Sequence, residues 1–203
     1  MPIPAAIHAT RTTTSLLDAL RDNANEPVWA AIDARYRPVV TSMSRRLGLN
    51  DSDADEVAQQ TLTEFVKGYG EGRYDRSKGR LSSWILGIAH HTILHVVRKS
   101  GRENPTTTSL GEVVDEPALR SIWADERDRA ILAQALDALR GESGVDDRTL
   151  LAFELVSLRG VPAAEVGAQC DMTVDQVYVA KSRIVKRLRV HVEAITAAFE
   201  EDR

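Results

Sequence analysis

Residues 160–189 constrain the fold of this 203-residue chain more than any other segment. Pro162 suits the first turn of a helix, because its missing N–H has no partner there. Asp171 lies where the chain must reverse, and aspartate tolerates a left-handed backbone better than most residues. Thr173 followed by Gln176 is typical of a capping box that starts a second helix. The segment therefore predicts a helix-turn-helix.

The second of these helices has one apolar and one polar face. Apolar residues recur at steps of three and four and predict a buried stripe, made of Val177, Ala180, Ile184, Leu188, Val192 and Ile195. The opposite face carries Tyr178, Val179, Ser182, Arg183, Lys186 and Arg189. The major groove of DNA admits one helix that presents such a face. The pattern therefore indicates DNA binding.

The charge of the chain is local rather than global. The net charge is −4, which argues against a protein that coats nucleic acid by bulk attraction. Basic residues gather at 181–189, whereas acidic residues gather at 51–56 and 112–128. This segregation predicts two kinds of partner, one anionic and one cationic.

Several classes of protein are excluded by composition. Cys170 is the single cysteine, so the chain has neither an intramolecular disulfide nor a thiolate zinc cage. No apolar run approaches the roughly 20 residues that span a bilayer, and the start of the chain lacks the pattern of a secretory signal. We expect a cytoplasmic protein with no membrane partner and no cofactor or metal.

Helical periodicity dominates the chain, and 43% of its residues are hydrophobic, which is enough for real cores. We predict an all-α fold of two small helical domains joined by an acidic flexible linker, the second domain containing the helix-turn-helix. The predicted parts are an N-terminal extension with a short helix (1–24), a first domain (25–100), the linker (101–125), a second domain (126–195) and a tail (196–203).

The first domain is predicted to contain three helices. The first carries an apolar face from Trp29 to Leu47, and Gly48 and Asn50 end it. The second starts near Asp51, stops near residues 68–72, and buries Ala54, Val57, Thr61, Leu62 and Phe65. A polar loop over 73–80 leads into the third. After glycines and prolines in the linker, a further helix is predicted from about Asp125.

Three runs of residues carry a resemblance to a known family. Asp53–Gln60 (D-A-D-E-V-A-Q-Q) is similar to the acidic D-A-E-D-L-V-Q-E helix of that family, and Tyr74–Ile85 is similar to its F-D-P-x-R-G-x-F-x-x-W-L run. Gly160–Arg189 aligns without a gap to its G-L-S-Y-E-E-I-A…S-V-G-T-V-K-S-R pattern. The chain thus resembles the extracytoplasmic-function (ECF) sigma factors of bacterial RNA polymerase, in the sigma-70 family.

The resemblance implies a function and partners. Residues 25–100 would be sigma domain 2, which binds the clamp helices of core polymerase and recognises and melts the −10 element. Residues 126–195 would be sigma domain 4, which binds the flap and the −35 element. The partners implied are core RNA polymerase, promoter DNA and, as is common in the family, an anti-sigma factor. The implied polymerase-binding residues are Asp53, Asp55, Glu56, Gln59 and Gln60.

For the upstream element, the helix-turn-helix supplies the candidate contacts. They are Thr173, Gln176, Tyr178, Val179, Ser182, Arg183, Lys186 and Arg189. The cations most simply bind phosphates, while Val179 is placed to meet a thymine methyl group. Two interpretations stay open for Gln176, contact with adenine or a capping role. Tyr178, Val179 and Ala180 stand where the family pattern has K-S-R, which leaves the preferred DNA sequence undetermined.

For the downstream element and strand opening, the candidates are Arg73, Arg76, Lys78, Arg80, His90, His91, Arg98 and Lys99. Trp84 either stacks on a base or anchors the core, and its apolar neighbours favour the anchor. His91 and His95 have the spacing of a metal pair, but no carboxylate or cysteine completes a site. If the histidines contact phosphates, DNA binding should strengthen as the pH falls towards 6.

Two other functions compete with the sigma factor. A stand-alone helix-turn-helix regulator would bind DNA tightly without polymerase, which the net negative charge disfavours. An enzyme with a phospho-accepting histidine at 90–95 would need a glycine-rich nucleotide site, and no such site accompanies these residues. We therefore expect a protein that is not an enzyme.

Overall fold

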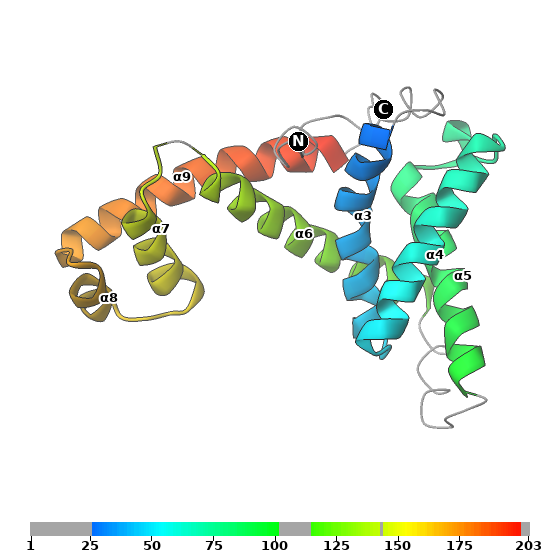
Figure 1. Ribbon diagram of the computed structural model, residues 1–203, viewed down its shortest axis with the longest axis horizontal. Coiled ribbons are helices and arrows are strands. Elements are labelled where there is room, and N and C mark those ends of the chain that lie inside the picture. The colour runs from blue at the N-terminus through cyan, green and yellow to red at the C-terminus, as the bar shows by residue number, and fades with distance from the viewer. Residues whose placement is uncertain (1–25, 102–114, 143, 200–203) are drawn as a thin grey trace. The chain divides into compact units, whose positions relative to one another are not determined.

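The computed structural model describes residues 26–101, 115–142 and 144–199. All the regular structure in these ranges is helical, as predicted (Figure 1). The elements are α3 (Glu26–Arg46), α4 (Asp51–Gly70), the 3-10 turn η1 (Arg76–Lys78), α5 (Leu81–Gly101), α6 (Glu116–Arg140), α7 (Asp147–Phe153), the π-helix η3 (Glu154–Leu158), α8 (Ala163–Cys170) and α9 (Val174–Phe199). None of these helices is long and apolar enough to cross a membrane.

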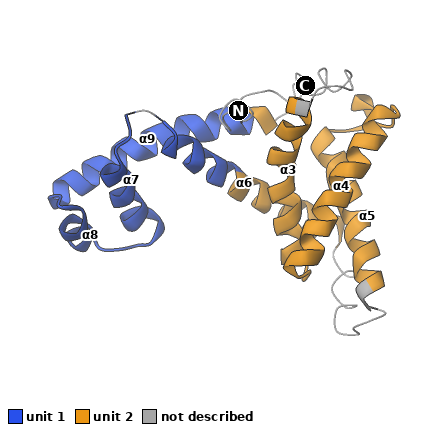
Figure 2. Ribbon diagram, viewed as in Figure 1, with its two compact units in different colours: residues 1–10, 131–197 blue, residues 11–130, 198–203 orange. Residues whose placement is uncertain are grey.

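The described residues form two compact units (Figure 2). The N-terminal unit comprises residues 26–101, 115–130 and 198–199, and the C-terminal unit comprises residues 131–142 and 144–197. The predicted N-terminal extension (1–24) lies outside the described residues, as does most of the predicted linker. Of the predicted tail, residues 196–199 form the end of α9.

In the N-terminal unit, α3, α4 and α5 pack side by side (Figure 1). The predicted buried face of α4 is confirmed, since Ala54, Val57, Thr61, Leu62 and Phe65 are all buried. Large side chains are buried in this unit, among them Tyr36, Met43, Phe65, Leu81 and Ile85. This packing leaves the opposite face of α4 and the loop before α5 exposed.

Local signals set the start of α4 as the sequence predicts. Gly48 has a φ of 90°, which an L side chain rarely adopts, so the chain can turn sharply after α3. The Asn50 side chain then accepts a hydrogen bond of 2.9 Å from the Asp53 N–H and caps α4. Asp51 and Asp53 add negative charge to the first turn, where the helix dipole favours it.

The start of α6 differs from the prediction. A helix was expected from about Asp125, yet α6 begins at Glu116, inside the predicted linker. The Asp115 carboxylate accepts a hydrogen bond of 2.9 Å from the Ala118 N–H, and Pro117 sits in the first turn, where its missing N–H costs nothing. Asp115 followed by Pro117 is thus a helix-start signal, which the sequence analysis attributed to a linker.

The first half of α6 and the end of α9 belong to the core of the N-terminal unit. The Trp123 ring stacks against Tyr36 with centroids 6.5 Å apart, and the Phe199 ring meets Tyr36 edge-on at 5.7 Å. The buried Arg35 guanidinium donates a hydrogen bond of 2.8 Å to the carbonyl oxygen of Ala198. These contacts cover the side of α3 that α4 and α5 do not.

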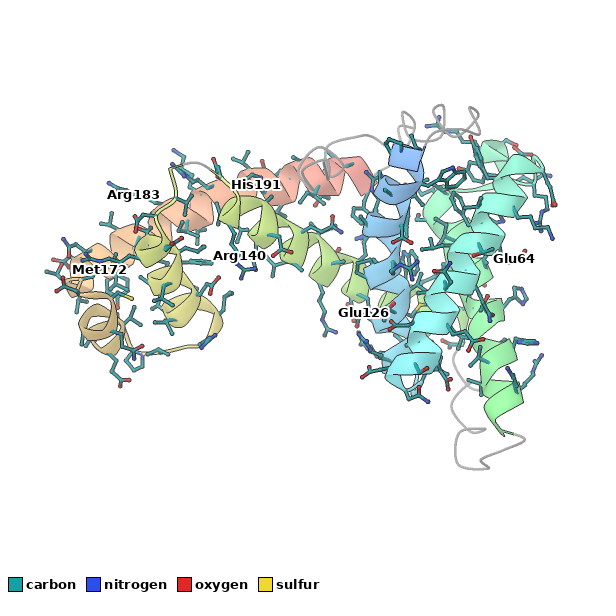
Figure 3. The ribbon with its side chains drawn as sticks, viewed as in Figure 1. Glu64, Glu126, Arg140, Met172, Arg183 and His191 are labelled. Atoms are coloured by element: carbon teal, nitrogen blue, oxygen red, sulfur yellow. The ribbon has the colours of Figure 1, made fainter. Side chains whose placement is uncertain are left out.

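A charged cluster also holds α6 on α3. The Glu126 side chain is only 4% exposed, and its carboxylate lies 3.1 Å from Arg46 and 2.7 Å from Arg129. Figure 3 labels Glu126 beside α3. Because a buried carboxylate requires a partner, this cluster specifies where α6 packs.

The C-terminal unit has two small cores. Leu139, Phe153 and Ile184 form one of them. The other brings α8 and α9 together over Ala152, Leu155, Val166, Cys170, Val177 and Ala180. Small side chains at these positions let the helices approach closely, and each unit buries its own apolar surface.

The turn between α8 and α9 has the predicted conformation. Asp171 adopts a left-handed backbone with φ 49° and ψ 51°. The Thr173 hydroxyl accepts a hydrogen bond of 3.2 Å from the Gln176 N–H, and the Gln176 side chain accepts one of 2.8 Å from the Thr173 N–H. This reciprocal pair is the predicted capping box.

Candidate nucleic-acid interface and acidic binding face

The polar face of α9 is exposed along its first four turns. The side chains of Tyr178 and Val179 are 54% and 49% exposed. Ser182, Arg183, Lys186 and Arg189 are exposed as well, and Figure 3 labels Arg183 on this helix. On the other side of α9, Val177, Ala180 and Ile184 are buried and pack in the core of the unit. The outer face of the helix thus carries three cations, Arg183, Lys186 and Arg189, beside three uncharged side chains.

Thr173 and Gln176 have a structural task at the start of this face. Both side chains take part in the capping box, so the oxygen of Gln176 is engaged by the Thr173 N–H. The capping interpretation of Gln176 is therefore confirmed. Its contribution to an interface is to fix the first turn of α9.

Arg148 was missed by the sequence analysis. It lies on α7, and its guanidinium donates a hydrogen bond to the carbonyl oxygen of Asp171, in the turn before α9. It lines a hollow of about 380 Å³ together with Gln176, Val179 and Arg183, three of the predicted DNA contacts. No sequence signal marks it, because α7 and the turn meet only in the folded unit.

In the N-terminal unit, the predicted basic loop precedes α5 and is exposed. Arg73 lies 2.9 Å from Glu71 and 3.7 Å from Glu64, and Lys78 lies 3.4 Å from Asp75. These pairs are exposed and individually weak, so they leave the cations available to a stronger anion. Arg76 and Arg80 are exposed in the same loop.

Other predicted downstream contacts lie far from this loop. Arg98 and Lys99 are exposed in the last turn of α5, which has 21 residues. At a rise of about 1.5 Å per residue, the helix is roughly 30 Å long. The loop over 73–80 and the end of α5 therefore cannot contact the same phosphate group.

Trp84 is the half-buried anchor that the sequence favours. Its ring stacks on Tyr74 with centroids 5.3 Å apart and meets Phe65 edge-on at 5.6 Å. Tyr69 and Tyr74 approach each other to 6.3 Å. The aromatic cluster fixes the basic loop against α4 and α5, since Tyr74 belongs to the loop and Trp84 to α5.

The predicted histidines differ in environment. His91 and His95 are exposed, whereas His90 is half-buried. Burial, followed by the charge of His91, lowers the pKa of His90 below its usual value. At pH 6 His90 is therefore less charged than an ordinary histidine, which weakens its case as a phosphate contact. Among the described residues, no group of three or more potential ligands is arranged to hold a metal ion.

The acidic face of α4 carries the residues predicted to bind polymerase. Asp55, Glu56 and Gln59 are exposed, while Asp53 and Gln60 are half-buried. The Gln60 amide donates to Glu56 at 2.7 Å, and the Gln59 side chain accepts from Arg37 at 2.8 Å. A groove of about 470 Å³ between α3 and α4 runs beside Gln59 and is lined mainly by apolar residues such as Leu62 and Val66. A basic partner helix would find both charge and apolar surface here.

Comparison with known proteins shows what the chain is similar to. A model of sigma-70 region 2 matches residues 32–103. The ECF RNA polymerase sigma factor SigE of Mycolicibacterium smegmatis is 28% identical over 165 residues, which cover 77% of this chain and 58% of that relative. The ECF RNA polymerase sigma factor RpoE of Cereibacter sphaeroides is 23% identical over 168 residues, which cover 80% of this chain and 91% of that relative.

Residues 32–103 thus match sigma-70 region 2, and the chain is similar to ECF RNA polymerase sigma factors over most of its length. The matched region 2 runs from α3 to the end of α5, so it contains the acidic face of α4, the basic loop and the histidines. The chain spans somewhat more than half the length of the mycobacterial relative and nearly all of the other. Both alignments cover more of the chain than region 2 does.

Proposed function

We propose that this chain is a sigma factor that binds core RNA polymerase and directs initiation at promoters with two recognised elements. Both relatives are RNA polymerase sigma factors by name. The observation that carries the proposal is the match of region 2 to α3–α5, which display an acidic face and a basic loop on separate exposed surfaces. The similarity to sigma factors favours this function over a stand-alone regulator. The chain would carry out no bond chemistry itself.

For the upstream element, we propose that α9 lies in the major groove. Its exposed Tyr178, Val179 and Ser182 would reach base edges, and Arg183, Lys186 and Arg189 would bind phosphates. Thr173 and Gln176 would act by holding the first turn of the helix. Arg148 joins this set, because it borders the same hollow as Val179 and Arg183.

For the downstream element, the exposed cations of the loop and of α5 would hold a single strand once the duplex opens. Such surfaces combine a basic groove with aromatic rings on which bases stack. Arg73, Arg76, Lys78 and Arg80 lie at one end of α5, with Arg98 and Lys99 at the other. This separation supports contacts with different parts of the DNA. His91 faces solvent between the two groups.

For polymerase, the acidic face of α4 is the proposed docking site. Asp55 and Glu56 are exposed and Gln59 borders the groove beside α3. The negative charge of Asp55 and Glu56 would complement a basic helical partner. It would act most strongly on the association rate.

The deciding experiment is a pull-down of core polymerase with the chain, followed by run-off transcription on a library of promoters. The expected result is a stable complex and transcripts that appear only when the chain is present. The proposal is overturned if the chain fails to bind polymerase and instead binds duplex DNA tightly alone at physiological ionic strength.

A charge-reversal pair tests the docking face. The variant with Asp55→Lys and Glu56→Lys should lose polymerase binding by at least tenfold while its helical content stays unchanged, since both side chains are exposed. The matched control has Glu116→Lys and Asp128→Lys, which change the net charge equally at exposed positions of α6. Equal binding by the two variants would remove the assignment of this face.

A further inference from the structure

A polar network joins α3 to the acidic face of α4. The Arg37 guanidinium on α3 donates from Nε to both carboxylate oxygens of Asp33 at 2.9 Å, and from Nη2 to Oδ1 at 2.6 Å. The same Nη2 atom donates to the side-chain oxygen of Gln59 on α4 at 2.8 Å. All three residues line the groove of about 470 Å³ between the two helices. Arg37 therefore links a carboxylate of α3 to a residue of the proposed docking site.

Arg37 determines how the Gln59 amide is turned. An arginine side chain offers donors only, so it engages the oxygen of the amide rather than its NH2 group. The planar amide then holds the NH2 group on the side of the carbon that does not face Arg37. Among the described residues, none accepts a hydrogen bond from this NH2 group, and Gln59 is exposed. Two donor hydrogens are thus left for a partner.

The network lies within electrostatic reach of the acidic residues of α4. The hydrogen bond to Asp33 is the main cause that raises the pKa of Arg37, and the charge of Asp55 contributes to the rise. Arg37 therefore stays charged beside the docking residue Asp55, and its charge is held by Asp33. A partner that meets Asp55 also meets the NH2 group of Gln59, one helical turn further along α4.

We infer that Arg37 is a positioning residue of the docking face, which turns the NH2 group of Gln59 toward polymerase. The matching partner surface offers an acceptor oxygen, from a carbonyl or a carboxylate, opposite Gln59 and cations opposite Asp55 and Glu56. A partner with cations alone would leave the NH2 group unpaired when water is expelled, which costs affinity. The inference rests on the proposed docking site and adds to it a residue of α3 and a requirement on the partner's chemistry.

Gln59→Glu separates the effect of the donor from that of charge. Glutamate keeps the length of the side chain and an oxygen for Arg37, but it adds a negative charge and removes the NH2 group. Charge attraction alone predicts unchanged or tighter binding of polymerase. The inferred donor predicts binding weakened by about three- to tenfold.

Ser121→Glu is the matched control for the added charge. Ser121 is exposed on α6 in the same unit and does not line the groove. Polymerase binding by this variant should equal that of the unmodified chain. Equal weakening by Ser121→Glu and Gln59→Glu would assign the loss to charge and overturn the inference.

Arg37→Lys tests the positioning. Lysine keeps the charge but replaces the guanidinium fork by one nitrogen, so it cannot hold Asp33 and Gln59 in the same way. Polymerase binding should weaken several-fold, because ordering a mobile Gln59 side chain on binding costs affinity. In the Gln59→Ala background the same substitution should change binding by less than about twofold, since Arg37 acts through Gln59. An equal loss in both backgrounds would show a merely structural role and overturn the inference.

The measurement is the affinity of core polymerase for the complete chain, with circular dichroism as the check that each variant is folded. The pair of Arg37 and Asp33 is partly exposed, so its loss should leave the fold intact. If the unmodified chain fails to bind polymerase, the proposed function fails and the inference fails with it. If the reversal of Asp55 and Glu56 abolishes binding while Gln59→Glu binds as tightly as the unmodified chain, the inference alone fails.

Discussion

The two units of this chain bury their apolar surface in different ways. In the N-terminal unit, α3, α4 and α5 are each at least 20 residues long, and the unit buries large side chains such as Tyr36, Met43 and Phe65. In the C-terminal unit, α7 and α8 are short, and the core between α8 and α9 contains Ala152, Cys170 and Ala180. The second unit also buries the large side chains of Leu139, Phe153 and Ile184, so it differs from the first in having an additional core that depends on close approach of the backbone.

The difference matters for how each unit presents its exposed polar face. In the N-terminal unit, the acidic face of α4 is the outer side of a helix whose inner side is firmly packed. In the C-terminal unit, the outer face of α9 is oriented by the turn over 171–173 and by the capping box. We therefore expect the loss of a large core side chain to destabilise either unit, and added backbone bulk next to the turn before α9 to destabilise the second.

The largest expected effect comes from Phe65→Ala in the N-terminal unit. Phe65 is fully buried and contacts the Trp84 ring, so its loss should cost about 3–5 kcal/mol of unfolding free energy. Urea unfolding with residue-resolved hydrogen exchange would measure it. Val66→Ala, at a neighbouring residue that is 37% exposed, should change stability by less than about 0.5 kcal/mol. Similar losses of unfolding free energy in the two variants would contradict the interpretation that large buried side chains stabilise this core.

Gly167→Ala tests the backbone contact of the C-terminal unit. An added Cβ would lie 2.6 Å from the Met172 carbonyl oxygen, so the turn and α8 must separate, at a cost of about 1–3 kcal/mol. Thermal unfolding and exchange of the amides in α8 and α9 would detect the loss.

Gly87→Ala is the matched control in the N-terminal unit. A Cβ there meets no atom within 4 Å, and Gly87 lies inside α5, so the change should stabilise that unit by about 0.5–1 kcal/mol. If both alanines had effects of the same sign, the contrast between the units would be lost.

Glu126→Gln tests the charged cluster that holds α6 on α3. Gln keeps the shape but loses the charge that Arg46 and Arg129 face, and we expect a loss of about 1 kcal/mol. Denaturant unfolding at low and high salt would show it. Glu116→Gln breaks an exposed pair with Arg120 and should have no measurable effect. An unchanged midpoint for Glu126→Gln would show that apolar contacts alone place α6.

The smallest expected effects are changes in folding stability with pH. We expect these changes to be alike in the two units. Hydrogen bonds from the side chain and the backbone N–H of Thr149 lower the pKa of Asp146, and those from Ser77 lower the pKa of Asp75. A lowered folded-state pKa means that the unfolded chain takes up the proton first as the pH falls. The stability from these caps is therefore present above the ordinary pKa of 3.8 and is lost below it, through the lowered folded-state pKa.

Paired variants make this pH prediction measurable. Asp146→Asn should be less stable than the unmodified chain at pH 6, and the difference should shrink towards pH 2. Asp75→Asn should behave in the same way. A difference that grows on acidification would contradict the assigned sign.

Features set by neighbouring residues could be predicted from the sequence, and features set by distant residues could not. Apolar periodicity identified the buried face of α4, and the residues 171–176 identified the turn and cap before α9, because these signals are local. The start of α6 was misplaced, since the prolines and glycines around it resemble a linker. The cap by Asp115 was readable, but the burial of Trp123 depends on Tyr36, far away in the chain.

Sequence alone determined the helical class and the resemblance to ECF sigma factors, and it predicted the two exposed polar faces, because periodicity, caps and motifs lie within one or two helical turns of chain. Tertiary structure decided which charges share a site. It brought Arg148 to the turn before α9 and separated the basic loop from the end of α5. Which charged residues lie close together depends on which helices pack together. No local pattern of residues encodes that packing.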